Sequence, residues 1–98
     1  MFEIRFAEGA IGDLKHLPTN RRITIVDAID RNLSTAPLVP SRNRKELTGL
    51  VPPWEQVRPV WQLRVGDYRV FYDADPESSV VIVQAIRHKA RKTTGEIL

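Results

Sequence analysis

The sequence predicts an α+β fold with the order β-α-α-β-β-β, in which two helices pack on one face of a twisted antiparallel sheet. Two observations carry this prediction. Residues 61–72 read as a tight hairpin, and residues 80–89 read as a third strand that follows it. Residues 2–33 begin with strand-like alternation and continue with two stretches of helical periodicity. We expect one domain over residues 1–98, since this length suffices for one core.

The N-terminal third is expected to contain one strand and two helices. Apolar and charged residues alternate over residues 2–6, as in a half-buried strand. A short helix is expected over residues 7–16, and because its two glycines weaken it, it depends on tertiary packing. A Leu-Pro-Thr-Asn break then precedes a second helix over residues 20–33. The side chains expected to face the core are Ala10, Ile11, Leu14, Ile25, Val26, Ile29 and Leu33.

Residues 34–59 are the least regular part of the chain. Five prolines interrupt this stretch, and proline removes a backbone donor and disfavours helix at the residue before it. We expect a long surface connection that touches the fold at Leu47 and at residues 50–51. A loop this long in a small domain is either functional or contains an element that the pattern does not reveal. Residues 91–98 are expected to form a short C-terminal helix or a tail.

The turn Gly66-Asp67 fixes the centre of the predicted sheet. Glycine tolerates positive φ, which the first position of a primed two-residue turn requires. Strands are expected over residues 58–65, 68–74 and 79–87. Placing Val65 opposite Tyr68 sets the register and gathers one apolar face, onto which the helices pack. That face consists of Trp61, Leu63, Val65, Tyr68, Val70 and Tyr72.

The same register places polar side chains on the opposite face, which we expect to stay open. Arg64 lies directly opposite Arg69, and two like charges in cross-strand contact destabilise a sheet. Gln62 and Arg87 are expected on this face as well. An anion bound between the arginines offsets their repulsion, so this face is a candidate site for an anionic partner.

Positive charge is concentrated in two segments of the chain, which has a net charge of +3. Residues 84–95 contain no acidic residue but carry Arg87, His88, Lys89, Arg91 and Lys92. A second basic cluster comprises Arg42, Arg44 and Lys45. Such asymmetry is typical of a surface that meets phosphates or an acidic partner, although solvated surface charge gives the same pattern.

Composition excludes several classes of site. The chain has no cysteine, and therefore has neither a disulfide framework nor a thiolate metal site or nucleophile. This agrees with a cytoplasmic location, where thiols stay reduced. No apolar run approaches the ~18 residues that a membrane span requires, so no membrane partner is expected. We also expect no metal and no cofactor.

Three segments of the chain together resemble a known family. Residues 63–72 read Leu-Arg-Val-Gly-Asp-Tyr-Arg-Val-Phe-Tyr, residues 45–50 contain a Lys-x-Leu-x-Gly pattern, and residues 80–89 end in a His-Lys pair. These segments look like the signature motifs of the RelE/ParE superfamily of toxins from type II toxin–antitoxin systems. The strand-helix-helix opening agrees, so the resemblance spans almost the whole chain. It implies a cognate antitoxin as partner, which covers the open sheet face or lies against the helices.

The resemblance implies one of two activities. RelE-like members cleave mRNA in the ribosomal A site, whereas ParE-like members poison DNA gyrase and have no nuclease site. We expect a ribosome-dependent mRNA endoribonuclease that inhibits translation, with the ribosome and mRNA as partners. The alternatives are a DNA gyrase inhibitor and a catalytically degenerate toxin that only binds its antitoxin. The fold alone does not choose among them, because one fold hosts different functions.

Cleavage of RNA by its own 2′-hydroxyl needs a base, an acid and cations around the phosphate. Arg69 matches the sheet arginine of the family and is the candidate phosphate ligand, with Arg64 beside it. The alternative for Arg69 is a surface ion pair with Asp67 or Asp73. His88 is the candidate acid or base, because histidine changes charge between about pH 5 and 8, although a lone histidine is often an ordinary surface residue. The candidate contacts to RNA phosphates are Lys45, Arg87, Lys89 and Arg91.

The sequence departs from the RelE-like pattern at the expected chemistry. Members of that branch place lysines at positions that align with Val60 and Gln62, and a tyrosine near the position of Gly95. Without those groups the site has less charge to ease removal of the 2′ proton, which keeps both alternatives open. Trp54 is interpreted either as a stacking platform for a base or partner, or as a plug of the seam between helices and sheet.

Overall fold

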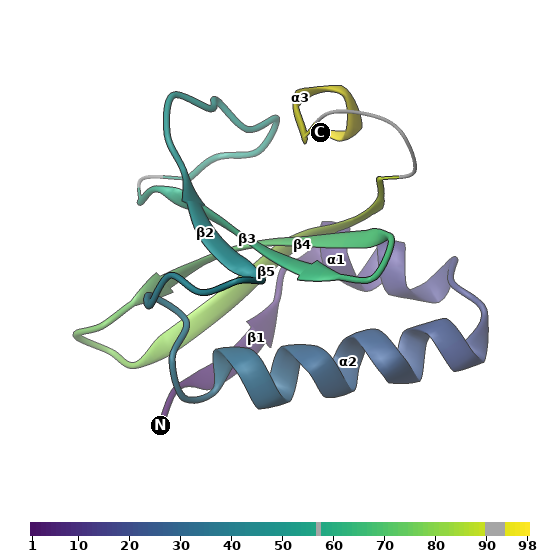
Figure 1. Cartoon of the computed structure of the whole chain (residues 1–98), viewed down its shortest axis with the longest axis horizontal. Coiled ribbons are helices and arrows are strands. Elements are labelled where there is room, and N and C mark those ends of the chain that lie inside the picture. The colour runs from purple at the N-terminus through teal and green to yellow at the C-terminus, as the bar shows by residue number, and fades with distance from the viewer. Residues whose placement is uncertain (57, 90–93) are drawn as a thin grey trace.

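The computed structural model describes residues 1–56, 58–89 and 94–98. Within these residues the chain forms a five-stranded sheet with two longer helices on one face and a short helix on the other (Figure 1). The strands are β1 (Glu3–Phe6), β2 (Arg44–Leu47), β3 (Val60–Val65), β4 (Tyr68–Asp75) and β5 (Val80–His88). The helices are α1 (Glu8–Lys15), α2 (Thr19–Leu33) and α3 (Thr94–Ile97). The α+β architecture predicted from the sequence is confirmed.

The strand order in the sheet is β1-β5-β4-β3-β2. Strands β3, β4 and β5 pair antiparallel, as predicted, and β2, which the sequence did not predict, pairs antiparallel with β3. Strand β1 pairs parallel with β5, so the sheet is mixed and not wholly antiparallel as predicted. Alternation over residues 3–6 predicts a strand but contains no information on the direction of its partner. No helix in the described parts of the chain is long and apolar enough to span a membrane.

Strand β2 lies inside the stretch that the sequence predicted to be a connection without regular structure, so that prediction is wrong at this point. Its register pairs Arg44 with Leu63 and Leu47 with Val60. The strand is four residues long and its two central side chains are exposed charges. It therefore shows no alternation of apolar and polar residues that a sequence pattern can detect.

The predicted register of the β3–β4 hairpin is confirmed. Val65 pairs with Tyr68, and Leu63 pairs with Val70. Gly66, the first residue of the turn, has φ of 57°, in the region that glycine enters without steric penalty. The turn chemistry and the apolar face together therefore determine which side chains share a face.

The pairing of β4 with β5 contains a bulge. Phe71 pairs with Ala85 and Tyr72 pairs with Val83, so Gln84 is an extra residue on β5. Odd-numbered residues of β5 therefore face the helices before Gln84 and face the opposite side of the sheet after it. Val83 belongs to the cluster that packs under the helices, whereas Ala85 belongs to the cluster on the other face.

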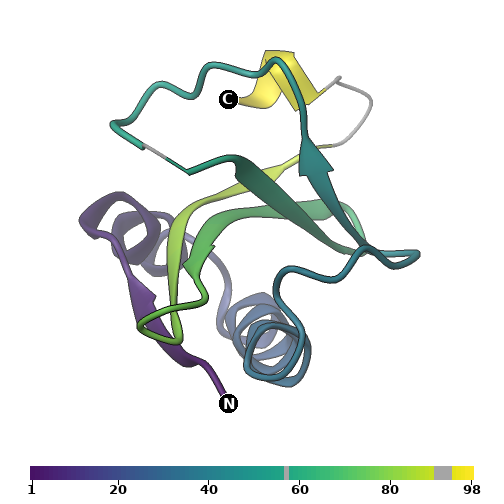
Figure 2. The same cartoon turned by 90° about the vertical axis from the view of Figure 1, so that its left-hand side faces the viewer.

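The main core lies between the two longer helices and the sheet (Figure 2). Three residues of α2, namely Ile25, Ile29 and Leu33, are buried there as predicted. Ile11 and Val26 were expected in this core but are 43% and 39% exposed. Each follows a buried residue by one position, and one position on a helix is a rotation of about 100°, which turns the side chain away from the sheet. The sheet residues of the core are Trp61, Leu63, Val70, Tyr72, Ala74, Val81, Val83 and Ile86.

The opposite face of the sheet is not open throughout, contrary to prediction. Val60, Phe71 and Ala85 form a second apolar cluster on it, and such a cluster gains stability when other apolar groups cover it. Figure 2 shows the chain after β2 and helix α3 on this side of the sheet. The partly buried side chains that pack on the cluster are Leu47, Leu50, Trp54, Ile97 and Leu98.

Trp54 is one of these covering side chains. Its ring lies against Phe71, with ring centroids 6.4 Å apart, and its Nε1–H donates to Oε1 of Gln56 at 2.6 Å. Trp54 therefore plugs an apolar seam, but on the face away from α1 and α2 and not between those helices and the sheet.

A buried hydrogen bond fixes the chain that leaves α2. The hydroxyl of Tyr72, which is fully buried, donates to the carbonyl of Pro37 at 2.6 Å. Burial raises the pKa of Tyr72 above its ordinary value, and nearby Arg44 opposes this shift in part. Tyr72 thus stays a neutral donor and anchors the segment that leads to β2.

We expect Tyr72→Phe to lower the free energy of unfolding by about 1–3 kcal/mol, because it leaves a buried carbonyl without its donor. Urea denaturation followed by circular dichroism measures this loss. Tyr68→Phe is the matched control, since the Tyr68 hydroxyl makes no hydrogen bond with another described residue, and its effect should stay within about 0.5 kcal/mol. Equal losses for both variants would contradict the anchoring role of Tyr72.

Candidate phosphate-binding site

Arginine and lysine residues gather on the face of the sheet opposite α1 and α2, next to the apolar cluster of Val60, Phe71 and Ala85. A concavity of about 170 Å³ lies there, and we call it the basic cradle. Its lining residues are Ser41, Arg42, Asn43, Arg44, Lys45, Gln62, Arg64, Arg69 and Lys89. Six of these nine residues are arginine or lysine and none is acidic. Such a concavity favours an anion, because low-dielectric walls of one charge focus the electrostatic field.

Strand pairing explains why distant parts of the chain meet in the cradle. Lys45 pairs with Gln62 across β2 and β3, and Arg64 pairs with Arg69 across β3 and β4. Lys89 follows β5, and its backbone N–H donates to the carbonyl of Asp67 at 2.8 Å, beside the hairpin turn. The predicted apposition of Arg64 and Arg69 is confirmed, and both side chains face the cradle.

Arg69 is the most deeply placed arginine of the cradle, at 8% exposure. Its Nη1 donates to the carbonyls of Gly66 and Tyr68, both at 2.9 Å. Burial, followed by repulsion from Arg64, lowers the pKa of Arg69, and Asp67 opposes the shift in part. The described residues contain no ion pair of Arg69 within 4.0 Å, so the alternative of a surface pair with Asp67 or Asp73 is not formed. The guanidinium of Arg69 is therefore held by two backbone carbonyls and has no carboxylate partner among the described residues.

Two further lining residues support the cradle. Nη1 of Arg44 donates to the backbone carbonyl of Asn32, which ties β2 to the end of α2. Gln62 forms part of the cradle wall at 6% exposure, and its Oε1 accepts from the hydroxyl of Thr94 at 3.1 Å. Helix α3 therefore touches the cradle as well as the apolar cluster beside it.

The sequence reasoning did not identify Ser41 and Asn43 as site residues. Their signal in the sequence is weak, because they are polar residues that flank Arg42 in a proline-rich stretch. They enter the cradle only because β2 exists and pairs with β3, which brings the turn before β2 next to Arg64. That strand was itself missed.

The structure brings together four of the residues that the sequence proposed as the site, namely Lys45, Arg64, Arg69 and Lys89. Arg87 does not join them, since its guanidinium is paired with the carboxylate of Asp13 on α1. The same Asp13 oxygen accepts the backbone N–H of Ile86 at 2.9 Å, so this contact holds α1 against β5. Arg91 lies outside the described residues.

His88 is also separated from the cradle arginines. It pairs with Tyr68, and the two rings lie 5.0 Å apart between centroids. Tyr68 packs with the helix-side core, so the exposed ring of His88 lies on that side of the sheet and Arg69 on the other. The bulge at Gln84 separates His88 from Arg69, because it turns the side chains that follow it on β5 to the opposite face of the sheet.

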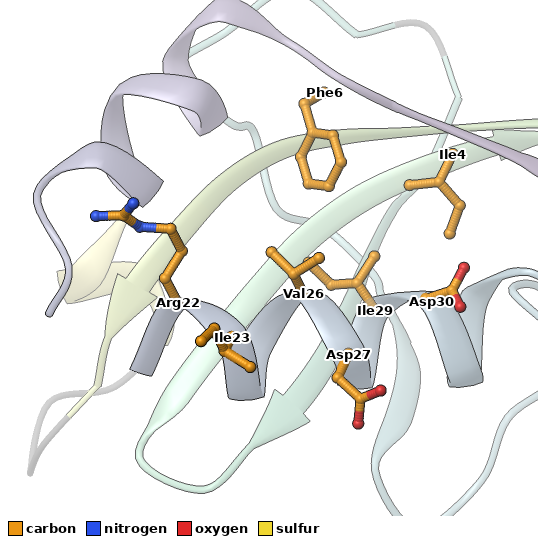
Figure 3. Close-up of a pocket in the computed structure, with 8 residues that line it drawn as sticks. All are labelled: Ile4, Phe6, Arg22, Ile23, Val26, Asp27, Ile29 and Asp30. Carbon is orange, nitrogen blue, oxygen red and sulfur yellow. The ribbon is translucent and has the colours of Figure 1, made fainter. Parts of the chain in front are cut away.

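A second concavity lies on the helix side, between α2 and β1, and has a volume of about 640 Å³. Figure 3 shows Ile4 and Phe6 of β1 facing α2 across this space. Ile23 on its rim is 64% exposed, Arg22 lies toward one end, and Asp27 and Asp30 lie toward the other (Figure 3). We call it the α2 groove, and its lining residues are Ile4, Phe6, Arg22, Ile23, Val26, Asp27, Ile29 and Asp30.

A family model described as the ParE toxin of the type II toxin–antitoxin system parDE matches residues 4–93. The chain belongs to this family. It is therefore a type II toxin of the RelE/ParE superfamily, as its sequence motifs suggested. No curated protein sequence matches it.

Solved structures of toxin–antitoxin systems share the fold. The toxin–antitoxin complex RelBE2 from Mycobacterium tuberculosis is similar at 27% identity and a TM-score of 0.68, over 89% of this chain and 96% of that chain. The archaeal RelE–RelB complex from Pyrococcus horikoshii gives 19% identity and a TM-score of 0.70, over 92% and 97% of the two chains. The intact RelBE complex of E. coli is similar at 19% identity and a TM-score of 0.64, over 88% of this chain and 94% of that chain. The latter two likenesses concern the fold alone.

Proposed function

We propose that this toxin is a ribosome-dependent, metal-independent mRNA endoribonuclease that acts in the cytoplasm and holds the scissile phosphate in the basic cradle. The observation that carries the proposal is the convergence of five cationic residues, Arg42, Lys45, Arg64, Arg69 and Lys89, on a single concavity whose described lining residues include no acidic one. Arg44 lines the same concavity, but its guanidinium is bound to Asn32 on α2. A phosphodiester is the anion that such a set of guanidinium and ammonium groups suits best, because arginine binds phosphate through paired hydrogen bonds.

The proposed reaction is attack of the 2′-hydroxyl oxygen on the adjacent phosphorus, with loss of the 5′-oxygen of the next nucleotide. Negative charge grows on the phosphate oxygens in the transition state, and preorganised cations stabilise it. Arg69 suits this role because its two backbone hydrogen bonds hold the guanidinium in place. Arg64 lies opposite and adds a second charge, and the bound phosphate offsets the repulsion between the two.

The 2′-hydroxyl loses its proton to a water molecule as the new O–P bond forms, and the product is a 2′,3′-cyclic phosphate. A lysine ammonium donates the proton that the leaving 5′-oxygen takes up, and Lys89 and Lys45 both line the cradle. His88, the group that the sequence favoured, lies on the other side of the sheet. The proposal therefore keeps Arg69, Arg64, Lys89 and Lys45 and gives His88 no part in the chemistry.

We expect Arg69→Gln to reduce mRNA cleavage on programmed ribosomes at least about 100-fold, because it removes a charge from the phosphate site. Primer extension on ribosome-bound mRNA measures the cleavage. His88→Gln should retain activity, and Arg31→Gln on α2 serves as the control for loss of an exposed arginine. Loss of cleavage in His88→Gln with a folded protein would contradict this assignment.

A second candidate function is inhibition of DNA gyrase without nuclease activity. One observation favours it: the cradle has no histidine among its lining residues, and Val60 and Gln62 stand where RelE-like nucleases place lysines. A toxin that only binds its target needs no proton-transfer groups. The family description, which names the ParE toxin, is compatible with this reading.

The two candidates differ in which synthesis stops first after induction in bacteria. We expect incorporation of labelled methionine to collapse early while incorporation of labelled thymidine continues, because mRNA cleavage stops translation directly. Both labels are followed in the same culture, and a strain that expresses Arg69→Gln is the control. Early collapse of thymidine incorporation would favour gyrase, and unchanged incorporation of both labels would indicate a toxin that only binds its antitoxin.

We also propose that the cognate antitoxin occupies the α2 groove. The groove exposes apolar side chains of α2 and β1, and its charge differs between its ends, with Arg22 toward one and Asp27 and Asp30 toward the other. The fitting partner is an antitoxin segment with apolar anchors, a basic residue near the aspartates and an acidic residue near Arg22. Similar solved structures are themselves toxin–antitoxin complexes, which supports such a partner.

We expect Ile23→Asp to weaken antitoxin binding at least about tenfold, because it places a charge in the apolar contact. Isothermal titration of purified toxin with its antitoxin measures the affinity. Ile11→Asp is the matched control, since Ile11 is also an exposed isoleucine but lies on α1 outside the groove. Equal affinities of wild type and Ile23→Asp would place the antitoxin elsewhere.

A further inference from the structure

The turn that precedes β2 forms one wall of the basic cradle. Ser41, Arg42 and Asn43 belong to the cradle lining together with Arg64, Arg69 and Lys89. The cradle volume of about 170 Å³ corresponds to roughly five or six waters at ~30 Å³ each. This space suits one phosphate or one base. A nucleotide whose phosphate lies at the arginines therefore has its base near the turn.

Backbone hydrogen bonds fix this turn in place. The N–H of Ser41 donates to the carbonyl of Arg44 at 2.9 Å, and the N–H of Arg44 donates back to Ser41 at 3.4 Å. The N–H of Arg64 on β3 donates to the carbonyl of Asn43 at 2.7 Å. The turn is thus joined to the strand that carries one of the phosphate-binding arginines.

The side chain of Arg44 braces the turn from the other side. Its Nε donates to the carbonyl of Val39, and its Nη1 donates to the carbonyl and the Oδ1 of Asn32, at 3.1–3.3 Å. The brace connects the turn to the last part of α2. Preorganisation of this kind improves recognition, because little conformational entropy is lost when a ligand binds.

Asn43 is a group on this turn whose side chain can distinguish one base from another. Its main-chain carbonyl and N–H are engaged with Arg64 and Ser41. Its side chain is exposed and makes no hydrogen bond with another described residue. The amide offers a donor and an acceptor side by side, a pattern that pairs with N6 and N7 of adenine. Bases of single-stranded RNA present such edges to side chains.

We propose that Asn43 is a specificity-determining residue that selects adenine next to the phosphate held by Arg64 and Arg69. The proposal rests on the proposed function of the cradle as an RNA site, but it does not require that the RNA be cleaved. Arg44 is a positioning residue in this arrangement, because it holds the turn and does not itself reach the base.

Binding of fluorescein-labelled pentaribonucleotides tests the proposal directly. Fluorescence anisotropy at low salt compares UUAUU with UUUUU, since phosphate contacts weaken as salt rises. We expect wild type to bind the adenine-containing probe about tenfold more tightly, the discrimination typical of one paired amide–base contact. Asn43→Ala should bind both probes equally, and Asn20→Ala, an exposed asparagine on α2, should discriminate like wild type.

Asn43→Asp guards against misfolding, because it keeps the side-chain shape. It lacks the amide donor and adds a negative charge, so it should bind both probes more weakly and also lose the preference between them. Discrimination that persists in both variants, or a wild type that binds the two probes equally or binds neither, overturns the role of Asn43. Cleavage of A-site codons on ribosomes is measured in parallel. A preference for the adenine probe without mRNA cleavage would support the role of Asn43 and reject the nuclease. Cleavage without a preference between the probes would support the nuclease and reject the role of Asn43.

Discussion

The apposition of Arg64 and Arg69 across the hairpin is the constraint on which the site depends. Like charges opposite each other oppose strand pairing, so another interaction must hold the register. Apolar packing on the other face does this, because Leu63 and Val70 are fully buried under the helices and a one-residue slip would expose them. Helices α1 and α2 therefore stabilise the apposition of Arg64 and Arg69 by packing on the opposite side of the sheet.

The bulge at Gln84 decides which side chain of the His-Lys pair reaches the arginines. Without the extra residue, β5 would continue the phase of Val81 and Val83, and His88 would share the face of Arg69. With it, His88 stacks beside Tyr68 and Lys89 lines the cradle. Because of this bulge, the proposed proton donor is the ammonium group of a lysine and not the imidazole of His88.

Sequence reasoning reached the hairpin register, with Arg64 opposite Arg69, and both long helices, because turn chemistry and a one-sided apolar pattern specify them locally. It proposed Lys45 and Lys89 from clustered positive charge and from the resemblance to the toxin superfamily. It missed what depends on long-range packing. Strand β2 has no apolar period, the cover over Phe71 comes from segments distant in sequence, and the bulge has no distinct local signal. The ion pair between Arg87 and Asp13 likewise forms only because α1 packs against β5, and no pattern along the chain predicts that contact.

The repulsion between Arg64 and Arg69 also bears on how this toxin can change over generations. Replacing Arg64 with a neutral residue relieves the repulsion on Arg69 while the helix-side core stays intact. Under the proposed function, a substitution that removes activity at the cradle leaves folding undisturbed or improved, a trade-off between stability and activity that is common at functional sites. On the same proposal, a single substitution yields an inactive descendant that still folds and still presents the α2 groove.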